Sequence, residues 1–260
     1  WNLPAYGWGA SWAVMQSASL FGAYSLSFLT ILLGASLAEF CAARRRIAAP
    51  ALMLVLFAGL WVYGALRLAA GPAGTVPNVV MRLVQPDVPQ NEKYVRRYVT
   101  RNWQRLLDLS RAPGKVTHIV WPEAAPPFLL DRSAVALGEI AALTKGGRSL
   151  ITGSARAARD GDTVSFYNSL YIFGPGGRLE AIYDKFHLVP FGEYVPFADL
   201  LGRIGISKLT EGQGGFSSGD GPHIYHVTGA PDVTPLICYE IIFPGAVTAR
   251  QSPGWLVNVT

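Results

Sequence analysis

Charge is scarce in this sequence and is missing altogether from its first 38 residues. Only 15% of the 260 residues are Asp, Glu, Lys or Arg, roughly ten percentage points below an average soluble domain. A mean hydropathy of +0.27 argues against a disordered chain. The sequence has no Gly-X-Y period, no sustained heptads and only two cysteines. Collagen-like, coiled-coil and disulfide-stapled classes are therefore excluded.

Two long uncharged runs predict a pair of transmembrane helices. The stretches from about Ser11 to Ala38 and from Ile47 to Leu66 each reach the roughly 20 residues that cross a hydrocarbon core of ~30 Å. A signal peptide is the alternative, but the first run is too long for one and no basic region precedes it. We therefore expect residues 1–70 to form a transmembrane helical hairpin that belongs to a larger membrane domain.

Arginines between the two runs set the expected orientation. Residues 44–46 are all Arg, and short loops rich in Arg stay in the cytoplasm. Residues 71–260 are then expected to face the periplasm of a bacterium, with the protein in its inner membrane. Because Cys41 lies beside the basic loop, a bilayer separates it from Cys238, and Cys238 is expected to be a free thiol.

Basic residues elsewhere do not indicate a nucleic-acid partner. The isoelectric point is 9.3, but no basic stripe with interleaved aromatic residues appears. Four arginines repeat along one amphipathic segment, at positions 96, 97, 101 and 105. A solvated helix face is the more frequent explanation, and contact with anionic lipid headgroups is the alternative.

From residue 77 onward, β-branched runs alternate with segments of helical period, which predicts an α/β sandwich with a mixed sheet. We expect helices over residues 90–111 and 133–143. We expect strands over 78–84, 116–121, 148–153, 163–173, 178–183, 223–227, 235–238 and 255–259. The turn Gly174-Pro175-Gly176-Gly177 predicts a hairpin between two of them.

Three polar residues lie at or just after the ends of predicted strands, where α/β sheets build their sites. Glu123 follows the strand 116–121, Lys185 opens a loop with two prolines, and Cys238 precedes a segment that predicts a helix. Taken singly, each has an ordinary explanation: a helix cap, a surface loop residue and an inert buried thiol.

Together, these three side chains have complementary chemistry. A thiol with a pKa of ~8.5 needs a base such as Glu123, helped by a helix N-terminus that stabilises the thiolate. A tetrahedral oxyanion needs a donor such as Lys185, worth ~3 kcal/mol in the transition state. The four histidines lack metal-ligand spacing and no Gly-rich phosphate loop occurs, so the sequence indicates no metal and no cofactor.

The motifs around these residues resemble the nitrilase superfamily of carbon-nitrogen hydrolases. They are WPEAA at 121–125, YDKFHLVPFGEYVP at 183–196 and ICYEIIFP at 237–244. With the two apolar runs, they resemble the apolipoprotein N-acyltransferase family within it. The resemblance implies an αββα sandwich in which Glu123 is the general base, Lys185 stabilises the oxyanion and Cys238 is the nucleophile. It also implies that Glu193, Tyr239 and Glu240 support the active site.

The resemblance implies a membrane-bound acyltransferase with a ping-pong mechanism. Such an enzyme moves a fatty acyl chain from a phospholipid, through a Cys thioester, to the α-amino group of the N-terminal diacylglyceryl-cysteine of an apolipoprotein, which completes lipoprotein maturation. Two other functions stay open. One is a membrane-tethered amidase or nitrile hydrolase with water as acceptor, and the other is a non-enzymatic lipid- or lipoprotein-binding module with an idle thiol.

The sequence is expected to be a fragment. It begins at Trp1 rather than Met, and its last apolar run continues to Thr260 without a turn. Members of the family it resembles have further N-terminal spans, a closing C-terminal span and an Asn-Asp-Ala-Trp segment after this last strand. We therefore expect the catalytic domain to be truncated and inactive alone.

Overall fold

The chain folds as two compact units, residues 1–75 and 76–260, and each is described by itself. The computed structural model describes residues 2–44, 47–71, 74–197, 215–243, 245–249 and 251–260. Two of the three arginines in the predicted basic loop, Arg45 and Arg46, lie outside the described residues. The membrane and periplasmic assignments of the two parts stay predictions.

Two apolar helices make up most of the first unit. Helix α2 (Ala18–Glu39) and helix α3 (Ala48–Ala69) are both long and apolar enough to cross a membrane. Leu26, Met53 and Phe57 form the core between them. The remaining elements are short: the 3₁₀ helix η1 (Pro4–Ala10), helix α1 (Trp12–Met15) and the π-helical turn η2 (Phe40–Arg44).

The first apolar run is not the single helix that its composition predicts. Helix α1 ends at Met15, and Gly22 inside α2 has φ 79° and ψ 170°, which only glycine adopts at little cost. Gly64 has a different role. A Cβ atom there would lie 1.8 Å from the Ala13 carbonyl oxygen, so α1 and α3 approach closely because this residue is glycine.

Among the described residues of the second unit, seven strands in two sheets form the centre. The larger sheet has the order β1 (Met81–Leu83), β2 (His118–Val120), β3 (Ser149–Asp160), β4 (Thr163–Phe173) and β5 (Leu179–Asp184). Its first three strands are parallel, and β4 pairs antiparallel with both β3 and β5. The smaller sheet pairs β6 (Val233–Ile237) with β7 (Trp255–Val259) in parallel.

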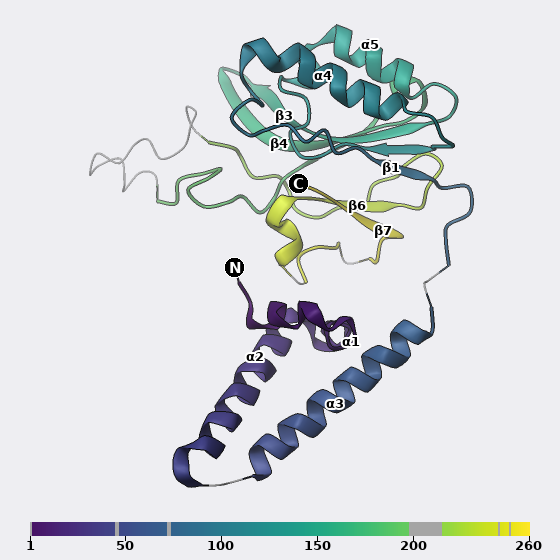
Figure 1. Ribbon diagram of the computed structural model, residues 1–260. Helices are drawn as coiled ribbons and strands as arrows, with labels where there is room; N and C mark the ends of the chain where they lie inside the picture. The colour runs from purple at the N-terminus through teal and green to yellow at the C-terminus, as the bar shows by residue number, and fades with distance from the viewer. Residues whose placement is uncertain (1, 45–46, 72–73, 198–214, 244, 250) are drawn as a thin grey trace. The chain divides into compact units, whose positions relative to one another are not determined.

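The described elements of this unit form three layers, α, β and β, as Figure 1 shows. Helices α4 (Arg96–Arg111) and α5 (Ala134–Leu143) cover one face of the larger sheet, and β6 and β7 cover the other. Alternate residues of each strand point to opposite faces. Ile119 and Leu150 therefore pack against the helices, while Val120 and Ile151 pack against the smaller sheet. The predicted α/β sandwich is confirmed.

Several element boundaries differ from those predicted. Helix α4 begins at Arg96 rather than residue 90, because Val95 is extended and a turn occupies residues 90–94. Strand β3 continues past Gly153 to Asp160, since β4 pairs with it along eleven residues. The predicted strand 223–227 is reduced to one bridge between Tyr225 and Val233. Three further elements are single 3₁₀ turns: η3 (Leu130–Arg132), η4 (Pro175–Gly177) and η5 (Cys238–Ile242).

The topology gathers the predicted site residues at one edge of the larger sheet. Because β4 is antiparallel to both neighbours, β5 runs parallel to β3 and β2. The carboxyl ends of β2 and β5 therefore lie at the same edge, where Glu123 and Lys185 follow them. Carboxyl ends of parallel strands are where such sheets bind ligands.

A buried histidine at the start of β2 predicts a pH-dependent stability. His118 is 1% exposed, with Nδ1 2.8 Å from Thr117 Oγ1 and Nε2 3.2 Å from the Thr228 carbonyl oxygen. Burial lowers the pKa of its imidazole below the usual range, against smaller opposing effects of that carbonyl and of Glu180. The unfolded chain therefore binds the proton more readily, and stability should fall as the pH drops below about 6.5.

We expect the free energy of unfolding to decrease between about pH 7 and about pH 5, and the decrease to be smaller in a His118→Gln variant. Urea denaturation followed by tryptophan fluorescence measures both. Identical pH dependence of the two proteins would contradict the assignment to His118.

Candidate active site

Glu123 lies in a tight turn that fixes its main chain. The Ala125 N–H donates to the Gly153 carbonyl at 3.1 Å, and Ala124 has φ 46°. A Cβ atom at Gly153 would lie 2.7 Å from the Glu123 Cα, so glycine is required beside this turn. The Lys93 ammonium donates to the Glu123 carbonyl oxygen at 3.2 Å. The carboxylate is thus projected from a backbone that has little freedom.

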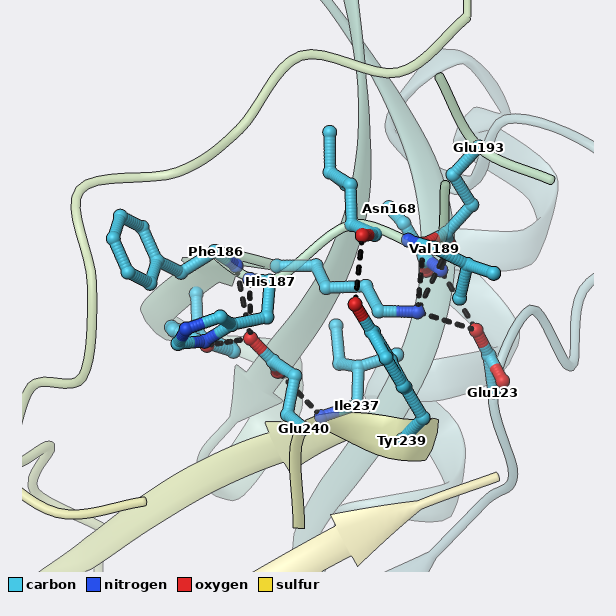
Figure 2. A network of polar contacts seen from close by, with 12 residues as sticks. Glu123, Asn168, Phe186, His187, Val189, Glu193, Ile237, Tyr239 and Glu240 are labelled. Carbon is cyan, nitrogen blue, oxygen red and sulfur yellow. Dashed lines mark hydrogen bonds and ion pairs between the residues drawn. The ribbon is translucent and has the colours of Figure 1, made fainter. Parts of the chain in front are cut away.

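Lys185 is a buried cation between two carboxylates. It directly follows β5, its side chain is 1% exposed, and its main-chain N–H donates to the Asn168 carbonyl at 2.8 Å. Its Nζ lies 2.9 Å from both Glu193 oxygens and 3.7 Å from Glu123 Oε1. Figure 2 labels the two carboxylates, Glu123 and Glu193, which lie close together in the site. A buried charge of this kind is tolerated only with such partners.

Asn168 joins the two carboxylates and was not among the residues predicted for the site. Its Nδ2 donates to Glu123 Oε1 at 2.7 Å and to Glu193 Oε1 at 2.9 Å, as Figure 2 shows. The residue lies inside β4 and is 6% exposed. Asn is depleted from strands, so a buried Asn in an apolar strand was a signal that could have identified it.

The loop after Lys185 closes back on Glu193. The Val189 N–H donates to Glu193 Oε2 at 2.8 Å, and the Glu193 N–H donates to the Val189 carbonyl at 2.8 Å. Phe191, between them, has φ 62°. Both Glu193 oxygens therefore have partners within the loop and the cluster.

Cys238 lies at the end of β6 in a strained backbone conformation. Its φ is 56°, in the left-handed region that non-glycine residues rarely adopt. The predicted helix after it is one 3₁₀ turn of five residues, η5, so an extended helix dipole does not act on the thiol as expected. Among the residues that the structure describes, the sulfur makes no hydrogen bond.

Glu240 connects the Cys238 turn to the loop after Lys185. The side chain is 2% exposed and accepts four hydrogen bonds of 2.8–3.0 Å. Three reach Oε1 and one reaches Oε2 (Figure 2). The donors are the Tyr183 hydroxyl and the main-chain N–H groups of Phe186, His187 and Ile237. One carboxylate thus holds β5, the loop and β6 together.

Comparison with known proteins identifies the family to which this chain belongs. The family model of the carbon-nitrogen hydrolases matches residues 82–257. The chain belongs to this family. It is 41% identical to an apolipoprotein N-acyltransferase of Bradyrhizobium diazoefficiens and 37% identical to one of Rhodopseudomonas palustris. Both alignments cover all of this chain, and 51% and 52% of the relatives, respectively.

The chain therefore spans about half the length of the curated relatives that it matches. A solved carbon-nitrogen hydrolase from Helicobacter pylori is 16% identical, over 69% of this chain and 59% of that one, with a TM-score of 0.47. The predicted nitrilase-like fold and the resemblance to apolipoprotein N-acyltransferases are confirmed.

In this member of the carbon-nitrogen hydrolase family, the predicted site residues form two connected clusters. Glu123, Lys185 and Glu193 form one, and Glu240 centres the other. Tyr239 links them, because its hydroxyl donates to the Leu188 carbonyl at 2.8 Å and the Lys185 Nζ lies 5.6 Å from its ring centroid. Cys238 lies in the chain between Ile237, whose N–H donates to Glu240, and Tyr239, and it packs against the core cluster that contains Tyr183.

Burial shifts the pKa of two groups around the clusters. It raises the pKa of the Tyr239 phenol, and Tyr194 and Glu193 act in the same direction. Tyr239 therefore stays a neutral hydrogen-bond donor at neutral pH. Burial lowers the pKa of the Lys93 ammonium, while the Glu123 charge opposes that shift. Within the described ranges, no three His, Cys, Asp or Glu side chains are placed to hold a metal ion.

Glu240→Gln should destabilise the second unit more than Tyr183→Phe. An amide nitrogen cannot accept a hydrogen bond, so one of the four donors would face another donor in a buried site. We expect a loss of about 3 kcal/mol for Glu240→Gln and about 1 kcal/mol for Tyr183→Phe, which removes a single donor. Urea denaturation measures both losses, and equal losses would contradict the four-donor arrangement.

Proposed function

We propose that this chain carries the catalytic centre of a membrane-bound N-acyltransferase. The acyl chain moves from a phospholipid, through a thioester on Cys238, to the α-amino group of the diacylglyceryl-cysteine at the N-terminus of an apolipoprotein. The observation that carries the proposal is the Lys185 ammonium between Glu123 and Glu193, next to the strained Cys238 turn. The names of the relatives whose alignments cover all of this chain support N-acyl transfer to an apolipoprotein.

A membrane location fits both substrates. Each carries acyl chains, and moving a chain into water costs ~0.8 kcal/mol per CH₂ group. The two apolar helices of the first unit would keep the enzyme beside such substrates. We propose a multi-pass protein of the bacterial inner membrane with its catalytic unit in the periplasm, on the argument from the basic residues at 44–46.

The hydrogen bonds favour Glu123 over Glu193 as the general base. Both Glu193 oxygens accept hydrogen bonds, from Asn168, Lys185 and the Val189 N–H. Glu123 uses only Oε1 among the described contacts, so its Oε2 is available for a proton. A base also needs some access to substrate, and Glu123 is 21% exposed against 13% for Glu193.

The first step forms the thioester. Glu123 takes the thiol proton of Cys238, the sulfur attacks the ester carbonyl carbon, and the carbonyl electrons move to oxygen beside the Lys185 ammonium. Collapse of this intermediate breaks the ester C–O bond. The leaving lysophospholipid oxygen takes the proton from Glu123.

The second step forms the amide. The neutral α-amino group of the acceptor attacks the thioester carbonyl, and Lys185 again stabilises the oxyanion. The C–S bond then breaks, the amine proton passes through Glu123 to the sulfur, and the Cys238 thiol is restored. Because the two substrates react in turn with one covalent intermediate, ping-pong kinetics follow.

The decisive prediction is a covalent adduct on Cys238. The full-length, membrane-inserted protein, incubated with phosphatidylethanolamine alone, should gain the mass of one acyl chain, and hydroxylamine should remove it. A Cys238→Ala variant should gain nothing. Intact mass spectrometry makes the measurement.

Two other outcomes would replace this function. Release of ammonia from a small amide without any acyl adduct would establish an amidase. A binding module would be established if the folded protein catalysed neither acyl transfer nor amide hydrolysis, and if it and its Cys238→Ala variant bound lipoprotein equally well.

Asn168 provides a test of the carboxylate pair. Asn168→Ala removes a hydrogen bond from each carboxylate and should slow thioester formation about tenfold. Asn168→Asp has nearly the same shape but adds a negative charge between Glu123 and Glu193, so it should be slower still. Intact mass spectrometry of reactions quenched at successive times gives both rates. Faster thioester formation by the Asn168→Asp variant than by the Asn168→Ala variant would count against this electrostatic arrangement.

A further inference from the structure

A five-residue segment outside the three sequence motifs lies along the Lys185 loop. We name residues 215–219, Gly-Phe-Ser-Ser-Gly, the strap. Its residues are outside regular helices and strands. The Ser217 N–H donates to the Phe166 carbonyl at 2.7 Å, which attaches the strap to β4, the strand that carries Asn168.

The strap donates hydrogen bonds to the main-chain carbonyls of Lys185 and Glu193, the two residues whose charged side chains meet in the site. The Gly219 N–H donates to the Lys185 carbonyl at 2.9 Å, and the Phe216 N–H donates to the Glu193 carbonyl at 2.7 Å. Between them, the Ser218 hydroxyl donates to the Phe186 carbonyl at 2.7 Å. The loop that carries the ammonium and its closest carboxylate is thus held along its length by one neighbouring segment.

Two glycines allow the strap to approach this closely. A Cβ atom at Gly219 would lie 2.1 Å from the Asp184 carbonyl oxygen, in the peptide group that joins Asp184 to Lys185. A Cβ atom at Gly215 would lie 2.7 Å from the Glu193 carbonyl oxygen, and Gly215 also has φ +71°. The glycines therefore stand at the two ends of the strap, each against the backbone of a site residue.

Lys185 is held from both sides as a result. Its N–H is bound by β4 through the Asn168 carbonyl, and its own carbonyl is bound by the strap through Gly219. We propose that the strap is a positioning element that sets Lys185 and Glu193 at the separation the oxyanion step requires. The proposal rests on the proposed function of Lys185. It assigns a role to residues 215–219, which lie outside the three sequence motifs.

The Gly219→Ala variant tests this role directly. Relief of a 2.1 Å contact with backbone requires the strap and the Asp184–Lys185 peptide to separate by about 1 Å, which removes the support of the strap from Lys185, and a misplacement of this size lowers rates about 100-fold. Thioester formation with phosphatidylethanolamine vesicles, followed by intact mass, should therefore slow about 100-fold. Alkylation of Cys238 by iodoacetamide forms no oxyanion, so its rate should stay within about twofold of native.

A second set of variants avoids a steric clash. Ser218→Ala removes the hydroxyl bond to the Phe186 carbonyl and a longer one, of 3.3 Å, to the Gly219 carbonyl inside the strap, and it should slow thioester formation about fivefold. Ser218→Thr keeps a hydroxyl and should restore the rate. Ser217→Ala is the matched control, because among the described contacts Ser217 contributes only its main-chain N–H. These three variants decide the question if Gly219→Ala does not fold.

Hydrogen exchange of the native protein tests the strap without reference to activity. The amides of residues 216, 217 and 219 should be protected. Unprotected amides, native thioester rates in both Gly219→Ala and Ser218→Ala, or alkylation slowed as much as acylation would each overturn the proposal. A native protein with protected amides but no acyl adduct would instead overturn the proposed function and leave the strap as a structural clamp of the loop.

Discussion

Burial of the Lys185 ammonium is the constraint on which the rest of this site depends. Removing a charge from water costs several kcal/mol even after relaxation, and this side chain is 1% exposed. The cost is offset only if two carboxylates stay close, which requires a rigid turn for Glu123 and a closed loop for Glu193. Gly153 beneath the turn and the strap beside the loop meet those two requirements.

The same arrangement gives chemically similar residues different roles. Glu193 and Glu240 have every oxygen engaged by donors, so each acts as a fixed anchor. Glu123 has an unengaged oxygen among the described contacts and is more exposed than Glu193. A carboxylate that exchanges protons needs this freedom, because a fully bonded carboxylate must break hydrogen bonds before it can be protonated. The environment, rather than the residue type, distinguishes the proposed base from the two anchors.

The sequence predicted the sandwich and the three strand-end residues because hydrophobic period and strand termination are local signals. It did not predict Asn168, whose partners are 45 and 25 residues away, or the strap, most of whose hydrogen bonds come from main-chain N–H groups that leave no mark in the sequence. The predicted start of α4, at residue 90, was wrong because the helical period of the sequence does not reveal that Val95 is extended. The helix expected after Cys238 was wrong for a related reason. The pattern of ICYEIIF is helical, but Glu240 is drawn into bonds with β5 and the loop, and only one 3₁₀ turn forms.

The same side chain also binds next to the strained residue Cys238. A left-handed conformation costs a non-glycine residue roughly 1–2 kcal/mol, and such strain persists only where the surroundings determine it. Glu240 accepts a hydrogen bond from the Ile237 N–H immediately before the cysteine and from the Phe186 and His187 N–H groups immediately after Lys185. One carboxylate therefore joins the Cys238 turn to the loop that begins at Lys185. A displacement of Glu240 would disturb both segments, so the strained residue and the buried ammonium belong to one hydrogen-bonded structure.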